Sequence, residues 1–237
     1  MVVLQHVDST NSLARRILER CWTKGGQCPE VAIVARHQTA GRGRSGNSWI
    51  SDENLGIYVT IVRFVSRSEL QTLPLLVGTG LGKALSRLGC DVRLKWPNDL
   101  LVDGRKLGGI LIETVGRGPG DVAAMIGFGV NHGHDQHRLP TESATSLRLE
   151  LDPLPGLATV AAALLRGVSE EMNHLGEVGY ARDAYASRSV HRPGDRLRCR
   201  IGREPIDGIF LGFDDHGFLR LEVSGKERVL NCGEILE

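Results

Sequence analysis

The segment 92–130 constrains the fold most, because it reads as several strands joined by tight turns. Asp103-Gly104 is a dipeptide suited to a hairpin turn, and it joins strand patterns at 100–102 and 106–114. Further strand patterns cover 92–96 and 122–130, with a glycine-rich loop from Gly116 to Gly120 before the last of them. The segment therefore predicts an antiparallel meander.

The rest of the chain adds both helices and strands. A strand at 2–7 is followed by a helix that Ser9 or Thr10 can cap, with Leu13, Ile17 and Cys21 recurring on one face. Other strands are expected at 31–35 and 55–64, and other helices at 70–88, 157–175 and 180–187. These elements predict an α+β fold with a mixed, largely antiparallel sheet packed with helices.

The pattern changes near residue 190. From Pro193 onward, short alternating strands at 197–201, 206–213, 218–223 and 228–231 are separated by turns that contain glycine and aspartate. Short, evenly spaced strands of this kind are typical of a small β-barrel. We therefore expect two domains, covering 1–189 and 190–237.

Composition excludes several classes of protein. A net charge of +1 gives no global basic field to recruit nucleic acid or an anionic membrane. The five cysteines form no C-x-x-C pair, so we expect buried free thiols in a reducing compartment. No signal peptide and no apolar run of membrane-spanning length is present. These features predict a soluble, cytoplasmic protein.

The first candidate site is the loop Gly41-Arg42-Gly43-Arg44-Ser45-Gly46, which matches the dinucleotide-binding pattern G-x-G-x-x-G. That reading requires a helix to open within the loop, and the residues that follow have no helical apolar period. The alternative is a surface loop with solvated arginines. Glycines let backbone N–H groups approach an anion, and Arg42 and Arg44 add permanent charge, so phosphate binding is favoured.

The second candidate site is Lys95-Trp96-Pro97-Asn98-Asp99, followed by Lys106 across the hairpin. An ordinary turn with solvated charges is the alternative. A carboxylate on Mg²⁺ with lysines on phosphates is a recurrent way to neutralise charge during nucleotidyl transfer. If Lys95, Asp99 and Lys106 converge, the site suits an enzyme that activates a carboxylic acid with a nucleotide.

Other motifs are less specific. The glycines of Gly127-Phe128-Gly129-Val130-Asn131 suit either close approach of a ligand or tight packing. Ser9-Thr10-Asn11 can simply cap a helix or can also bind a polar ligand. The histidines near 132–137 match no metal-ligand spacing, so we expect a solvated loop and no metal there. The chain has neither a P-loop nor a G-x-S-x-G motif.

Taken in order, these stretches resemble those of the biotin protein ligases (biotin–acetyl-CoA-carboxylase synthetases). The resemblance covers nearly the whole chain and rests on these motifs: Ser9-Thr10-Asn11, 38–44, 95–99, Lys106-Leu107-Gly108-Gly109-Ile110, 127–131 and the closing Asn231-Cys232-Gly233-Glu234-Ile235. It implies a catalytic domain similar to class II synthetases and a small C-terminal SH3-like barrel. It also implies that the chain forms biotinyl-5′-AMP from biotin and ATP, then biotinylates a lysine of a carrier domain.

The resemblance also implies roles for individual residues. The residues around biotin would be Ser9, Thr10, Asn11, Gln38, Gly41 and Arg42, with Gly109 and Gly127 packing against it. Lys106 would hold the biotin carboxylate and later polarise the acyl-adenylate carbonyl. The residues around ATP would be Arg42, Gly43, Arg44, Trp49, Lys95, Asn98 and Asn131, with Arg44 and Lys95 at the phosphates, Trp49 and Asn131 at the adenine, and Asp99 helping to hold Mg²⁺.

Several expectations about partners follow from the resemblance. The acceptor would be the biotin carboxyl carrier protein of acetyl-CoA carboxylase, and sheet edges in the meander would suit pairing into a homodimer. Because the chain begins at the catalytic domain, we expect a monofunctional ligase that binds no DNA. Ser45 and Asn47 replace arginines found in many members, which predicts looser retention of the adenylate. The alternatives are a lipoate or octanoate ligase of the same fold and a catalytically silent biotin-binding protein.

Overall fold

The computed structural model describes residues 1–25, 28–116, 122–202 and 204–236. The chain forms two compact units. The first comprises Met1–Leu70 and Val102–Ala162, and the second comprises Gln71–Leu101 and Ala163–Glu237. Each unit combines strands with helices, as the α+β prediction requires.

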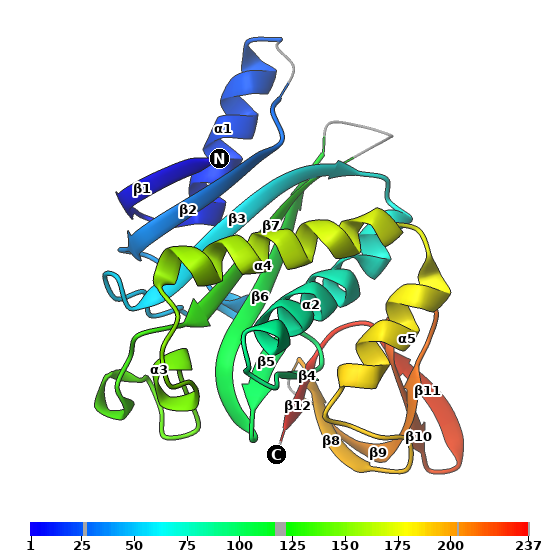
Figure 1. Cartoon of the computed structure of the whole chain (residues 1–237). Coiled ribbons are helices and arrows are strands. Elements are labelled where there is room, and N and C mark those ends of the chain that lie inside the picture. Colours follow the sequence, from blue (N-terminus) through cyan, green and yellow to red (C-terminus); the bar gives the residue numbers. More distant parts are fainter. Residues whose placement is uncertain (26–27, 117–121, 203, 237) are drawn as a thin grey trace. The chain divides into compact units, whose positions relative to one another are not determined.

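The sheet of the first unit is mixed and mainly antiparallel. Its strands lie in the order β1 (Val2–Val7), β2 (Val31–Gln38), β3 (Gly56–Val65), β7 (Val122–Asn131) and β6 (Arg105–Val115), shown in Figure 1. β1 runs parallel to β2, whereas β2–β3, β3–β7 and β6–β7 are antiparallel pairs. The parallel pair is possible because a helix, rather than a tight turn, connects β1 to β2.

That connecting helix, α1 (Thr10–Thr23), packs on β2, β3 and β7 (Figure 1). The side chain of Ser9 accepts a hydrogen bond from the Ser12 amide, so the predicted N-cap is confirmed. Ala14 and Leu18 are fully buried in this core, while Leu13 and Ile17 are only partly buried against it. The predicted apolar stripe therefore lies at the margin of the contact and not at its centre.

The second unit contains α2 (Glu69–Arg87), α5 (Val178–Arg188) and most of α4 (Leu157–Glu171). It also contains the hairpin formed by β4 (Arg93–Lys95) and β5 (Asp99–Val102). α2 and α4 approach closely at two glycines, because a Cβ on Gly80 would lie only 2.6 Å from the Gly167 carbonyl oxygen. Any larger residue at this crossing would push the helices apart.

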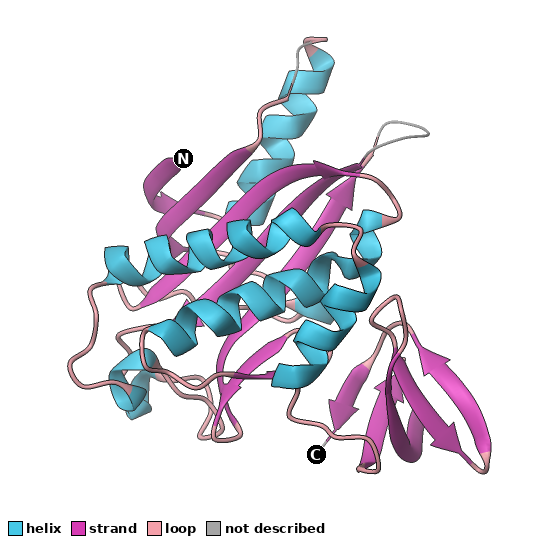
Figure 2. Cartoon of the chain, turned by 45° about the vertical axis from the view of Figure 1, so that its right-hand side comes forward, coloured by secondary structure: helices cyan, strands magenta, loops and turns pink. Residues whose placement is uncertain are grey.

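The C-terminal strands of the second unit form a separate antiparallel sheet, which Figure 2 shows curling on itself. The strand order is β11 (Lys226–Leu230), β10 (Leu219–Val223), β9 (Glu204–Phe213), β8 (Arg196–Ile201) and β12 (Glu234–Leu236). Leu197, Phe210, Leu219 and Leu221 fill its interior. A fifth strand, β12, is added to the four that the alternation predicts.

Other differences from the sequence predictions are local. The short helix α3 (Leu147–Glu150) has no apolar period long enough to predict it. The helix expected at 157–175 ends at Glu171 and continues as a 3-10 turn, Met172–His174. None of the five cysteines forms a disulfide; Cys90 and Cys199 are buried as expected, but Cys21 and Cys28 are only partly buried and Cys232 is exposed. The predicted loop from Gly116 to Gly120 lies mostly outside the described residues, and the domain boundary near residue 190 stays a prediction.

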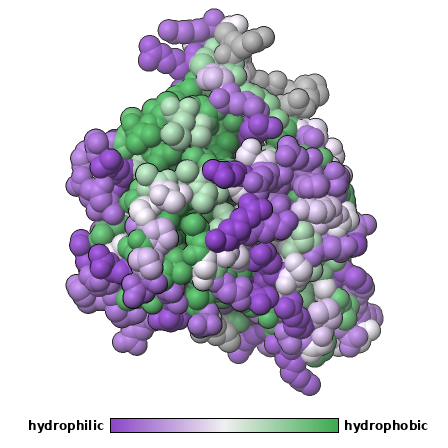
Figure 3. All heavy atoms as spheres, in the orientation of Figure 1, coloured by the Kyte–Doolittle hydropathy of each residue, from purple (hydrophilic) through white to green (hydrophobic). Residues whose placement is uncertain are grey.

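The surface is polar over much of the face in Figure 3, with hydrophobic residues gathered over β2 and β3. At the edge of this sheet, Val2 and Val3 of β1 are exposed. Among the described residues, no helix is long and apolar enough to cross a membrane.

Candidate functional site

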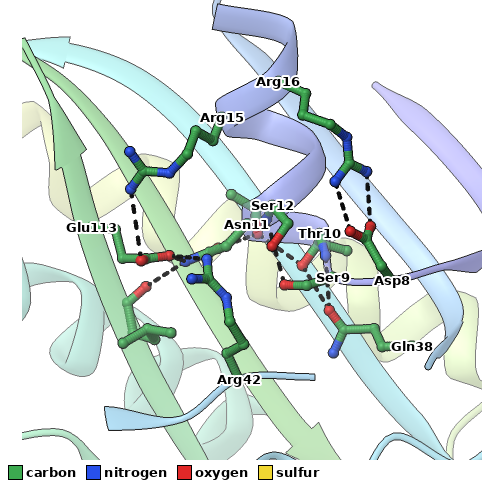
Figure 4. Close-up of polar contacts among 12 residues, drawn as sticks. Asp8, Ser9, Thr10, Asn11, Ser12, Arg15, Arg16, Gln38, Arg42 and Glu113 are labelled. Atoms are coloured by element: carbon green, nitrogen blue, oxygen red, sulfur yellow. Dashed lines mark hydrogen bonds and ion pairs between the residues drawn. The ribbon is translucent and has the colours of Figure 1, made fainter. Parts of the chain in front are cut away.

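A buried polar network lies where α1 meets the sheet of the first unit (Figure 4). The Thr10 amide donates to Gln38 Oε1 at 2.9 Å, and Gln38 Nε2 donates to Ser51 Oγ at 2.9 Å. Thr60 Oγ1 donates to Asn11 Oδ1 at 2.5 Å. Buried polar groups are costly unless they are hydrogen-bonded, and these groups are fixed in position by one another.

The turn before this network is held by an ion pair. Arg16 donates to both carboxylate oxygens of Asp8, at 2.6 and 2.8 Å, and this hydrogen bonding lowers the pKa of Asp8 to about 2. Asp8 also accepts the Ala40 amide through its backbone carbonyl at 2.8 Å. The start of α1 is thereby tied to the end of β2, where Gln38 lies.

Glu113 of β6 contacts cationic and polar donors from two distant segments, α1 and the Arg/Gly loop (Figure 4). Its Oε2 accepts from Asn11 Nδ2 at 2.8 Å and from Arg42 Nη2 at 2.5 Å, and Arg15 Nη2 lies 3.8 Å from Oε1. Two guanidinium groups thus share one carboxylate, which leaves a local positive charge. The pair with Arg42 also attaches the Arg/Gly loop to β6.

Replacing Glu113 by glutamine should release this loop. The Arg42 pair is partly exposed, so its loss costs at most about 1 kcal/mol, and we expect amide hydrogen exchange in 41–49 to rise about fivefold. The measurement is hydrogen–deuterium exchange followed by mass spectrometry. Glu30→Gln, which removes the exposed pair with Arg63, should leave the loop unchanged; equal exchange in both variants would contradict this role of Glu113.

The Arg/Gly loop closes on itself. The Gly43 amide donates to the Asn47 carbonyl at 2.7 Å, and the Trp49 amide donates to the Gly41 carbonyl at 2.9 Å. Ser45 has a φ of 55°, a left-handed conformation at the tip of the turn. The loop contains only the short 3-10 turn Arg44–Gly46, so rejection of the dinucleotide-binding reading is consistent with its geometry.

Trp49 adjoins the polar network, because Ser51 Oγ donates to the Trp49 carbonyl at 3.2 Å, and its indole packs against Gly129 of β7. A Cβ on Gly129 would lie 2.6 Å from the indole, so only glycine allows this packing. Lys106 Nζ lies 5.9 Å from the indole centroid, within cation–π range. The buried Trp49 Nε1 has no hydrogen-bond partner among the described residues. An aromatic face and a cation are therefore adjacent here.

Strand β6 contributes both Lys106 and Glu113 to this region. Lys106 and Glu113 are seven residues apart on this strand, which corresponds to about 23 Å at the usual rise per residue. Gly127 lies between them, on β7, and a Cβ there would be 2.5 Å from Asn11 Oδ1. Its position matches the tight-packing alternative. A ligand on this face would meet the polar network and, beside it, Trp49 and the Lys106 amine.

The remaining predicted residues lie in the second unit. Lys95 and Asp99 are paired across the β4–β5 hairpin, and Asn98 lies in its turn. Trp96 Nε1 donates to the Gly217 carbonyl at 3.2 Å, which ties this hairpin to the C-terminal sheet. The predicted convergence of these residues with Lys106 stays a prediction.

The described residues contain no group of three or more His, Cys, Asp or Glu arranged to hold a metal. His132 Nε2 lies 2.8 Å from the Pro155 carbonyl oxygen, which is a structural contact. His132 and His134 are both buried, so the expectation of a solvated loop is wrong at these two positions. A single carboxylate such as Asp99 still fits Mg²⁺ bound mainly through substrate phosphates.

Burial lowers the pKa of His134 below its ordinary value of 6.5. Below pH 6.5 the unfolded chain therefore binds a proton on His134 more readily than the folded chain does. We expect the free energy of unfolding to fall as pH decreases from 6.5, and to fall less steeply in His134→Gln. Urea denaturation at several pH values measures both slopes. Exposed His216→Gln is the control, and an unchanged slope in His134→Gln would contradict the prediction.

Sequence reasoning missed Glu113, Thr60 and Ser51. Glu113 could have been recognised from the sequence, because it is the one acidic residue in the segment 107–115. Apart from Glu113 and Thr114, that segment is apolar. Thr60 is hidden in a β-branched run, where threonine is a common strand residue. Ser51 follows the loop without any distinguishing pattern.

The chain matches a known class of protein. The sequence profile of the biotin/lipoate A/B protein ligase family matches residues 3–131. With more than half of the chain matched, the chain belongs to the biotin/lipoate A/B protein ligase family.

Within that family, its similar known proteins are biotin ligases. The chain is 34% identical to the bifunctional ligase/repressor BirA of Escherichia coli, over 99% of this chain and 73% of that protein. It is 29% identical to the biotin–[acetyl-CoA-carboxylase] ligase of Paracoccus denitrificans, over 98% of both. A biotin protein ligase from Aquifex aeolicus in complex with biotin and ATP matches with a TM-score of 0.78 and 26% identity, over 99% of this chain and 97% of that one.

Proposed function

We propose that the protein is an ATP-dependent biotin–[acetyl-CoA-carboxylase] ligase. It joins biotin to AMP and then transfers the biotinyl group to a lysine of a carrier domain. The observation that carries this proposal is the arrangement on one sheet face, where the polar network adjoins Trp49 and the Lys106 amine lies beside the Trp49 ring. Support comes from the relatives, which are named as biotin ligases and match nearly the whole chain.

In the first reaction, a carboxylate oxygen of biotin attacks the α-phosphorus of ATP. A C–O–P bond forms, the bond to the β-phosphate breaks, and pyrophosphate leaves with the bonding electrons. Lys106 neutralises the carboxylate, and Arg44 and Lys95 stabilise charge on the phosphates, because fixed cations are most effective where charge develops. Mg²⁺, held by Asp99 when bound, supplies further neutralisation of the phosphates.

In the second reaction, the acceptor lysine amine attacks the adenylate carbonyl, and AMP leaves. Lys106 polarises that carbonyl, so no nucleophile from the ligase is required. The Arg/Gly loop excludes water, which would otherwise hydrolyse the adenylate. Ser45 and Asn47 in this loop weaken its hold on the adenylate.

The polar network favours biotin over lipoate and octanoate. A ureido ring has two N–H donors and one carbonyl acceptor, which Thr10, Asn11 and Gln38 can match. An alkyl chain or a dithiolane ring has neither N–H donors nor a carbonyl acceptor, so it would gain no hydrogen bond from these groups. Ser9 and Gly41 complete the same part of the site.

The acceptor is the biotin carboxyl carrier protein or domain, and the reaction takes place in the cytoplasm. Pairing of two chains through their sheet edges is a further part of this proposal. Size-exclusion chromatography with light scattering tests the pairing directly.

The test of function is ATP–pyrophosphate exchange with biotin, lipoate and octanoate supplied in parallel with Mg²⁺. Exchange with biotin alone, followed by labelling of a purified carrier domain, is the expected result. Exchange with another acid would transfer the proposal to the lipoate or octanoate alternative. Folded protein that binds biotin but shows no exchange would be a silent binder.

A further inference from the structure

The segment 143–150 makes hydrogen bonds to both the amide and the carbonyl of Lys106. The Lys106 amide donates to the Ser143 carbonyl at 2.8 Å, and the Thr145 amide donates to the Lys106 carbonyl at 2.9 Å. Ala144 and Thr145 are buried in this contact. The position of Lys106 is therefore fixed by this segment, which is nearly forty residues later in the sequence.

The same segment holds Asn131. Asn131 Nδ2 donates to the Thr145 carbonyl at 2.9 Å, and Asn131 is itself buried at the end of β7. Thr145 thus contacts Lys106, which the proposed function assigns to the biotin carboxylate, and Asn131, which it assigns to the adenine. Any shift of Thr145 would move both.

One carboxylate fixes Thr145. Glu150 Oε1 accepts a short hydrogen bond from Thr145 Oγ1 and a second from Arg105 Nη2 at 2.8 Å. The side chain of Glu150 is only 11% exposed, and a charge so enclosed is stable only when it is paired. Glu150 therefore restrains the Lys106 backbone in two ways: through Arg105, which precedes Lys106 in the chain, and through Thr145, which is its hydrogen-bond partner.

We propose that Glu150 is a positioning residue for the ligase reaction, acting through Arg105 and Thr145 on Lys106 and Asn131. The inference rests on the proposed function, because it takes Lys106 and Asn131 as contacts of the two substrates. Glu150 lies on α3 and makes no contact with the reacting atoms in this assignment. Its effect comes from holding two substrate-binding residues in register.

Glu150→Gln tests the inference, because glutamine keeps the size of the side chain and removes its charge. A displacement of about 1 Å at a catalytic group can cost about a hundredfold in rate. We expect kcat of pyrophosphate exchange to fall between tenfold and a hundredfold. Glu171→Gln is the matched control, since Glu171 is also a largely buried carboxylate and pairs with Lys83 at 2.7 Å in the second unit. It should lower the melting temperature by a similar amount and leave kcat unchanged.

Thr145→Val shows whether the two residues act together. If Glu150 acts through Thr145, the double variant should be no slower than the slower single variant. Independent, multiplying losses would overturn the route through Thr145. A kcat in Glu150→Gln equal to that of Glu171→Gln would overturn the whole inference.

Amide hydrogen exchange at Lys106 and Thr145 tests the restraint without any activity. We expect both amides to lose protection in Glu150→Gln and to keep it in Glu171→Gln. Unchanged protection would refute the positioning role even in an active enzyme. If the wild-type protein shows no pyrophosphate exchange but Glu150→Gln still loses amide protection, the proposed function is refuted and the restraint is established.

Discussion

Replacing Lys106 by alanine should slow biotin-dependent pyrophosphate exchange about a thousandfold, because removing one group that stabilises developing charge costs about 10²–10³ in rate. Lys106 lies at the start of β6 with its amine near the Trp49 ring, where a carboxylate and a phosphate would meet. The backbone contacts of Lys106 involve no side-chain atom, so the fold should persist. Exchange assays and circular dichroism on the same preparation measure both properties.

Lys226→Ala is the control for the loss of one positive charge, because Lys226 is exposed on β11. It should retain full exchange activity. A Lys106→Ala enzyme within about tenfold of wild type would remove Lys106 from the mechanism. Direct binding of biotin by calorimetry then separates lost affinity from lost chemistry.

Replacing Trp49 by alanine should raise the KM for ATP about 5- to 150-fold, since stacking of a base on an aromatic ring is worth about 1–3 kcal/mol. The indole packs against Gly129, and the Lys106 amine lies 5.9 Å from the ring centroid. The KM for biotin should change much less. Steady-state exchange with each substrate varied in turn measures the difference.

Trp49→Phe keeps an aromatic face and should recover most of the ATP affinity. Gly129→Ala offers a matched perturbation, because its added methyl group would displace the indole without removing it. Equal rises in the KM values for ATP and biotin would argue against adenine stacking on Trp49.

Local patterns predicted the elements well. Strand alternation and the Asp103-Gly104 turn found β5, β6 and β7, and Ser9 was correctly predicted to cap α1. These features depend on neighbours in the sequence, so periodicity and turn chemistry report them. The helix α3 was missed because four residues carry too little period.

Long-range contacts could not be predicted in the same way. Asn11 and Glu113 are 102 residues apart, and no local pattern shows that they share a hydrogen bond. Gly127 and Gly129 indicated only that another group approaches the backbone closely at these positions. The structure shows that Asn11 fills the space at Gly127 and that Trp49 fills it at Gly129.

The group of contacts around Glu113 has a consequence for synthesis of the chain on the ribosome. Its donors come early, at Asn11, Arg15 and Arg42, but the carboxylate that joins them is Glu113. A nascent chain that has not yet emerged past β6 therefore exposes two arginines and an asparagine without their shared partner. The hydrogen bonds from Asn11 and Arg42 to Glu113 therefore form only when β6 docks beside α1.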